Sequence, residues 1–121
     1  MKRILIPTDF SKYSEEALKV AAQIARKNKS EIILLHLLEL PHQGGDTTNI
    51  GSSIPEIMFY KNAAIGNLEE LMDADYLKGI YVSEATKFEK VPEGILEVSK
   101  TNQVDLIVMG SHGTSGFEEL L

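Results

Sequence analysis

The chain has 121 residues, the size of a single domain, and it contains no cysteine, which excludes disulfides and thiolate metal sites. Its 18 Asp and Glu side chains exceed its 12 Lys and Arg side chains, giving a formal charge of −6. Such an acidic balance argues against a nucleic-acid partner. No apolar run reaches the length of a membrane span, so we expect a cytoplasmic protein with no membrane contact.

The first third of the chain predicts a strand, a helix and a second strand. Residues 3–6 are almost wholly apolar and end at Pro7, which is typical of a strand buried on both faces. Ser11 or Ser14 would then cap an alanine-rich amphipathic helix. Residues 31–38 form a second apolar strand. Two such strands joined by one helix indicate a parallel sheet.

The rest of the chain continues the alternation. Residues 41–53 are rich in Gly, Thr, Asn and Ser and predict a long loop. A long helix is expected over 55–78 and a third strand over 80–88, whose mixed polarity suits a sheet edge. A short helix over 92–101 leads to a buried fourth strand over 104–109. This order predicts an α/β fold: a Rossmann-like, doubly wound, open parallel sheet with helices on both faces.

Ligands of open parallel sheets bind beyond the carboxyl ends of the strands, and two strand ends carry suitable residues. The first strand ends in Pro7, Thr8 and Asp9, where Asp9 is either a local cap or a ligand-binding carboxylate. The fourth runs into the glycine-rich segment 110–116. Its N–H groups, with the helix start that follows, could bind phosphate. The same glycines could equally be a plain connector.

The histidines do not indicate a metal site or an enzyme. His36, flanked by leucines in a strand, is expected to be a hydrogen-bonded core residue, and His42 to be solvated. His112, inside the glycine-rich segment, either donates to a phosphate or fixes the loop. The three have no metal-ligand spacing, and the chain has no GxSxG nucleophile motif. A phosphoacceptor receiver domain would want paired acids after the first strand, where only Asp9 is present.

Three segments, taken in order and with their separations, resemble the universal stress protein family. They are ILIPTDFS at 4–11, ILLHL at 33–37 and DLIVMGSHG at 105–113. The resemblance implies ATP, with or without Mg²⁺, as the ligand. By that analogy Pro7, Thr8 and Asp9 lie against the adenosine and the main chain of Leu37 meets the adenine. The ribose and phosphates would be lined by Met109, Gly110, Ser111, His112 and Gly113.

The resemblance also implies a sheet of five strands in the order 3-2-1-4-5. Only eight residues follow Gly113, so we expect one domain over 1–121 that lacks its last helix and strand and has the strand order 3-2-1-4. Phosphate affinity should then fall, and the bare fourth strand should favour self-association or pairing with a second domain of the same kind. We expect a stress-response module that binds ATP without rapid catalysis. The alternative is a dimerisation or interaction domain that binds no nucleotide.

Overall fold

The structure is a computed structural model of the chain, and it describes residues 2–38 and 54–110. These residues form β1 (Arg3–Pro7), α1 (Lys12–Asn28), β2 (Glu31–Leu38), α2 (Ile54–Met72), the 3₁₀ turn η1 (Asp75–Leu77), β3 (Val82–Phe88), α3 (Val91–Thr101) and β4 (Leu106–Ile107). The order of strands and helices is the one expected from the sequence. The expected loop over 41–53 lies outside the described residues.

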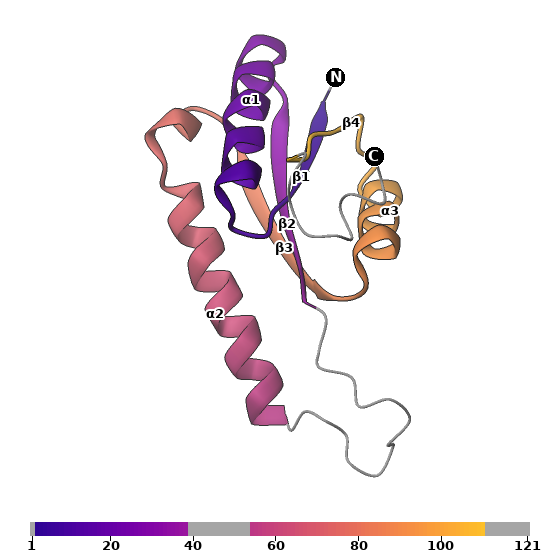
Figure 1. Ribbon diagram of the computed structural model, residues 1–121. Helices are drawn as coiled ribbons and strands as arrows, with labels where there is room; N and C mark the ends of the chain where they lie inside the picture. Colours follow the sequence, from indigo (N-terminus) through magenta and orange to yellow (C-terminus); the bar gives the residue numbers. More distant parts are fainter. Residues whose placement is uncertain (1, 39–53, 111–121) are drawn as a thin grey trace.

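Within the described residues, the strands form one parallel sheet in the order β3-β2-β1-β4. This confirms the expected order 3-2-1-4. β1 and β2, the most apolar strands, lie in the middle, and β3, whose side chains are all half-buried, lies at an edge. Figure 1 shows α1 and α2 on one side of the sheet and α3 on the other, so the doubly wound arrangement is also confirmed.

Alternation along the central strands divides the core into two layers. One layer joins Ile4, Ile6, Ile32 and Leu34 to the alanine-rich face of α1 and to Leu68 of α2. The other joins Leu5, Ile33 and Leu35 to Ile95 and Val98 of α3. Burying one such aliphatic side chain stabilises the fold by about 1.5–3 kcal/mol. Helices therefore pack on both faces of the sheet and hold the carboxyl ends of its strands in place.

The start of α1 resolves which serine caps it. Ser11 has extended backbone angles, and its hydroxyl accepts the Ser14 N–H at 3.2 Å. Ser14 itself lies inside the first turn and is buried. The helix ends at Lys29, which has left-handed angles and donates its N–H to the Ala25 carbonyl. Both ends of α1 are thus capped, which fixes the helix along the sheet.

The helix expected over 55–78 is interrupted. α2 ends at Met72, and the N–H groups of the next residues bond carbonyls three positions back, as Ala74 does to Leu71 at 3.1 Å. This tighter pattern forms η1 and then turns at Gly79, whose φ is +83°. β3 therefore begins at Val82, two residues later than expected.

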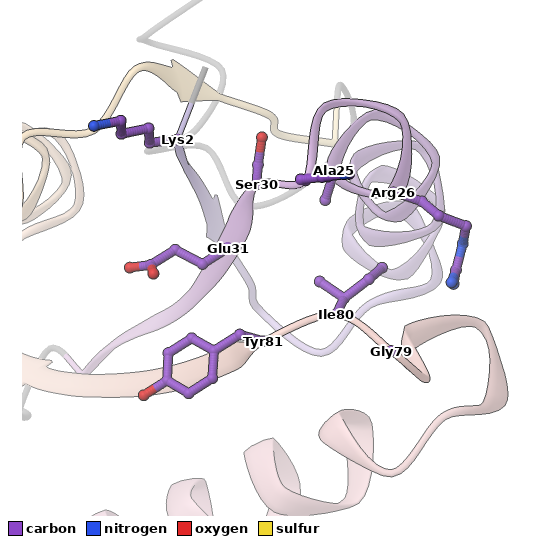
Figure 2. A pocket seen from close by; sticks show the side chains of 9 residues that line it. Lys2, Ala25, Arg26, Ser30, Glu31, Gly79, Ile80 and Tyr81 are labelled. Atoms are coloured by element: carbon purple, nitrogen blue, oxygen red, sulfur yellow. The ribbon is translucent and has the colours of Figure 1, made fainter.

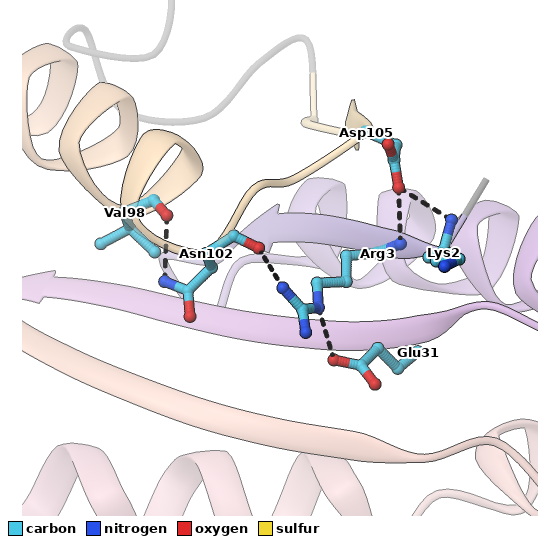
Figure 3. Close-up of polar contacts among 6 residues, drawn as sticks. All are labelled: Lys2, Arg3, Glu31, Val98, Asn102 and Asp105. Carbon is cyan, nitrogen blue, oxygen red and sulfur yellow. Dashed lines mark hydrogen bonds and ion pairs between the residues drawn. The ribbon is translucent and has the colours of Figure 1, made fainter.

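The fourth strand is shorter than expected, because β4 contains only Leu106 and Ile107. Before it, the Asp105 carboxylate accepts the N–H groups of Lys2 and Arg3 at 2.8 and 3.0 Å (Figure 3). Arg3 in turn donates to the Asn102 carbonyl at 2.7 Å and pairs with Glu31 at 3.1 Å. Main-chain hydrogen bonds from Asp105 N–H to the Arg3 carbonyl at 2.9 Å and from Val108 N–H to the Leu5 carbonyl at 3.0 Å flank β4. The side-chain hydrogen bonds add to them and fasten the end of α3 to β1.

Candidate functional site

The turn after β1 is built around the buried hydroxyl of Thr8. The Thr8 N–H continues the ladder by donating to the Leu35 carbonyl at 2.8 Å. Its Oγ1 accepts the Phe10 N–H at 3.0 Å and lies 3.1 Å from Ser14 Oγ. Because Ser14 Oγ donates to the Ser11 carbonyl at 2.9 Å, the Thr8 hydroxyl is the donor in the contact between the two. Pro7 is fully buried beneath this turn.

Asp9 lies half-buried at the mouth of the sheet, and Oδ1 accepts the Ser11 N–H at 3.0 Å. The capping role considered from the sequence is therefore present. Burial raises the pKa of the Asp9 carboxyl, but several hydrogen bonds, chiefly from the Ser11 hydroxyl and N–H and also from the Ser14 hydroxyl, together outweigh it, so the pKa lies below the ordinary 3.8. The carboxylate is consequently ionised at neutral pH, and it can accept hydrogen bonds from a ligand such as a ribose.

The end of β4 meets the start of α1 at Gly110. A Cβ added to buried Gly110 would lie 2.7 Å from the carbonyl carbon and oxygen of Tyr13. Only glycine permits this approach, and it brings the end of β4 beside the turn that carries Thr8 and Asp9. Met109 packs on the opposite face, against the layer formed with α3. The two strand ends singled out from the sequence are thus neighbours. Ser111, His112 and Gly113 lie outside the described residues.

Leu37 lies near the carboxyl end of β2, the strand beside β1 in the sheet. The Leu35 carbonyl bonds to Thr8 on the β1 side, whereas the Leu38 carbonyl bonds to Glu89 on the β3 side. Because main-chain groups alternate in direction along a parallel strand, Leu37 faces the β1 side, as Leu35 does. β1 pairs with β2 only as far as Pro7 and Leu35. The peptide groups of Leu37 therefore lie beyond the end of β1.

His36 differs from its expected role. It is half-buried, not in the core, and its Nδ1 lies 2.9 Å from the Thr8 carbonyl oxygen. Its ring packs on Phe10, with centroids 4.6 Å apart. The expectation that its ring is hydrogen-bonded holds. Its position beside the turn that carries Asp9 was missed, because a sequence does not show where the neighbouring strand ends.

A shallow acidic hollow of about 350 Å³ lies on the α1 and α2 side of Phe10. Its floor includes Phe10 and Leu71, and its rim carries Glu15 and Glu70. Burial, reinforced by the charge of Glu15, raises the pKa of the nearby Tyr76 hydroxyl to about 12. The carboxylates of Glu15 and Glu70 repel anions. A phosphate would therefore be favoured on the side of the turn where Gly110 lies.

A second hollow, of about 570 Å³, lies at the opposite edge of the sheet, where β2 and β3 begin (Figure 2). It is lined in part by Lys2, Arg26, Glu31 and Tyr81; in Figure 2 the Arg26 side chain points away from the other three. The Arg26 guanidinium donates to the Tyr76 and Lys78 carbonyls at 2.7 and 2.9 Å. Glu31 is paired with Arg3. The Arg26 and Glu31 side chains are therefore engaged in contacts of the fold.

The described residues contain neither a cluster of metal-binding side chains nor a helix able to span a membrane. In residues 2–38 and 54–110, no group of three or more His, Asp or Glu side chains is placed to hold a metal ion. No helix in those ranges is long and apolar enough to cross a membrane. The described residues at the ends of β1 and β4 offer main-chain groups, hydroxyls and the Asp9 carboxylate as hydrogen-bonding groups.

Known proteins match this chain over its whole length. The sequence profile of the Universal stress protein family matches residues 1–121. A universal stress protein of Methanocaldococcus jannaschii is 30% identical over 122 residues, which cover 99% of this chain and 70% of the relative. The structure of a universal stress family protein from Burkholderia pseudomallei superposes with a TM-score of 0.75 at 20% identity, covering 98% of this chain and 86% of that one. The universal stress protein from Archaeoglobus fulgidus in complex with dAMP gives 0.68 at 19% identity, covering 99% and 89%. These two structures share the fold described above.

Proposed function

Because this chain belongs to the universal stress protein family, we propose that it is a cytoplasmic regulatory module that binds ATP, with or without Mg²⁺, without rapid turnover. The ligand would lie at the carboxyl ends of β1 and β4. The adenosine would meet Thr8, Asp9 and the main chain of Leu37. The phosphates would meet the segment that begins at Gly110.

The observation that carries the proposal is the packing of Gly110 against the first turn of α1. It brings the start of the glycine-rich segment beside the turn that carries the Asp9 carboxylate, at the carboxyl ends of neighbouring strands. Crevices of this kind, at the carboxyl ends of neighbouring parallel strands, are where doubly wound sheets bind nucleotides. Anion binding there needs main-chain N–H groups and not lysines, which fits an acidic chain.

The choice of an adenine nucleotide has separate support. The Archaeoglobus fulgidus structure of the same fold holds dAMP. An ionised Asp9 suits the hydroxyls of a ribose, which are donors. The triphosphate is inferred from the family resemblance, in which Gly110 and Gly113 match Gly-x-x-Gly, the first half of the family's nucleotide-binding signature.

Slow turnover follows from the character of Asp9. An efficient general base has a pKa near the working pH, whereas the pKa of Asp9 is held below 3.8 by the hydrogen bonds from Ser11. Such a carboxylate is a weak base toward water.

Calorimetric titration with ATP and Mg²⁺ tests the proposal. We expect the folded chain to bind with a dissociation constant on the order of micromolar. Asp9→Asn should weaken binding by roughly tenfold to a hundredfold, the value of a hydrogen bond to a charged group. Gly113→Val should abolish binding, because its side chain would block the phosphates. Asp73→Asn makes the same chemical change at an exposed position after α2 and is the matched control. No heat from a folded chain would refute nucleotide binding.

The second candidate is an interaction domain that acts by self-association and binds no nucleotide. One observation favours it: in the described sheet, β4 has a strand neighbour on one side only, and Ile107 is 36% exposed. Unpaired apolar edges attract further strands. The two candidates differ in one outcome, since only the first expects ATP to bind at Asp9.

A further inference from the structure

His36 contacts the turn after β1 on both sides of Asp9. On one side, its Nδ1 lies 2.9 Å from the carbonyl oxygen of Thr8, which belongs to the peptide bond that precedes Asp9. On the other, its ring packs on Phe10, with an angle of 46° between the planes. Phe10 has a φ of 64°, a left-handed conformation that an L residue adopts only when its surroundings hold it there.

The hydrogen-bond partner of Nδ1 shows that this nitrogen carries a proton. A carbonyl oxygen only accepts hydrogen bonds, so Nδ1 must carry the proton in this contact. In the neutral ring the proton is then on Nδ1, and Nε2 is bare. This tautomer is a consequence of the fold and can be observed directly.

The same hydrogen bond affects Leu37. If the ladder between β1 and β2 continued, the Thr8 carbonyl would next accept the N–H of Leu37. Instead it accepts the His36 imidazole, and the main-chain hydrogen bonds of Thr8 include none from Leu37. The Leu37 N–H, which faces the β1 side, thus stays out of the ladder.

We propose that His36 is a positioning residue for the nucleotide site. Its Nδ1–H occupies the Thr8 carbonyl, which ends the ladder at Thr8, holds Asp9 at the mouth of the sheet and leaves the Leu37 N–H free to donate to a purine ring nitrogen. The role rests on the proposed adenine-nucleotide function, which His36 itself serves without touching the ligand.

Two substitutions separate the hydrogen bond from the ring. His36→Phe keeps an aromatic ring on Phe10 and removes the donor. His36→Asn loses the ring and keeps an N–H donor at the δ position. We expect the Phe variant to bind ATP about tenfold more weakly than the wild type and the Asn variant to stay within about threefold, as one hydrogen bond predicts. A residue that served stability alone would give affinities that follow the unfolding midpoints. The reverse ranking, or equal affinities for the wild type and the Phe variant, would overturn the role.

The nitrogen-15 spectrum of the wild-type imidazole tests the same role without nucleotide. A neutral ring protonated on Nδ1, and a Leu37 amide resonance that shifts in His36→Phe but not in His36→Asn, would support it. A neutral ring with its proton on Nε2 and none on Nδ1 would overturn it, whether or not ATP binds. If the wild type binds no ATP but the spectrum shows Nδ1–H and the Leu37 shift, the proposed ligand is wrong and the positioning of the turn stands.

Discussion

Gly110 and Gly66 form a matched pair of glycines for testing the crevice. A Cβ at Gly110 would collide with main-chain atoms of Tyr13 at 2.7 Å, whereas a Cβ at Gly66, exposed in α2, would meet nothing within 4 Å. Gly110→Ala should lower the free energy of unfolding by about 1–3 kcal/mol, because backbone must move. Gly66→Ala should raise it by about 0.5–1 kcal/mol through helix propensity.

Urea denaturation measures both changes, and ATP titration gives a second readout. Gly110→Ala should also weaken ATP binding, since it separates β4 from the turn that carries Asp9, and Gly66→Ala should leave binding unchanged. An unaltered stability of Gly110→Ala would mean that the end of β4 does not rest on α1.

Asp105 predicts a pH dependence of stability. Hydrogen bonds from the Lys2 and Arg3 N–H groups hold the pKa of this carboxyl below the ordinary 3.8. The unfolded chain therefore takes up the proton at a higher pH than the folded chain does. The stabilisation is complete above the unfolded pKa and is lost as the pH falls through the folded one.

We expect wild-type stability to fall more steeply than that of Asp105→Asn between about pH 5 and about pH 2. Urea midpoints along this range measure the difference. Asp73→Asn provides the same chemical change away from the hydrogen bonds of Asp105 to Lys2 and Arg3. Parallel curves for the wild type and Asp105→Asn would show that the carboxylate does not hold the start of β1.

At the level of elements, α3 and β2 meet through Gly94. A Cβ there would lie 2.7 and 2.9 Å from the two δ-carbons of Leu37. Gly94→Ala should therefore cost about 1–3 kcal/mol from overpacking, partly offset by helix propensity. In the double variant with Leu37→Ala the collision disappears, so the two effects should differ from additivity by about 1 kcal/mol. Denaturant unfolding of the four proteins measures this coupling, and strict additivity would contradict the contact.

The strands and helices were largely predictable because the spacing of apolar residues along the sequence indicates them. Runs such as residues 31–38 have few alternatives to a buried strand, and the mixed polarity of β3 matched an edge. The ends were not predictable. The 3₁₀ geometry after Met72 depends on a choice between carbonyls three and four residues back, which the apolar pattern does not reveal. The end of β4 depends on its pairing with β1, about a hundred residues earlier in the chain.

The sequence predicted which strand ends form the candidate site, but not the side chains that hold the turn after β1 in place. Pro7, Thr8 and Asp9 follow the first strand, and Gly110 follows the fourth, so topology alone brought them together. The roles of Ser14 and His36 depend on which groups face the Thr8 hydroxyl and carbonyl, and only a three-dimensional structure shows that.

At the scale of the whole molecule, the outer side of β4 predicts self-association, because no strand within residues 2–38 and 54–110 pairs with it. We expect the average mass from light scattering to rise with protein concentration, because the apolar Ile107 and unpaired main-chain groups can pair with a second copy. Ile107→Lys should reduce this rise, since an edge charge opposes pairing. Leu96→Lys, at an exposed position of α3, is the control. A monodisperse monomer at high concentration would contradict the prediction.

The sheet order has a further consequence while the protein is being made. β1 is synthesised before the other strands described here. Its hydrogen-bond partner Asp105 follows Lys2 by 103 positions. At roughly 5–20 residues per second, translation takes about 5–20 s to supply that partner. During this interval one side of an apolar central strand is unpaired and attractive to chaperones. A nascent chain can assemble the crevice only after Gly110 has emerged, so ligand cannot guide the early steps of its folding.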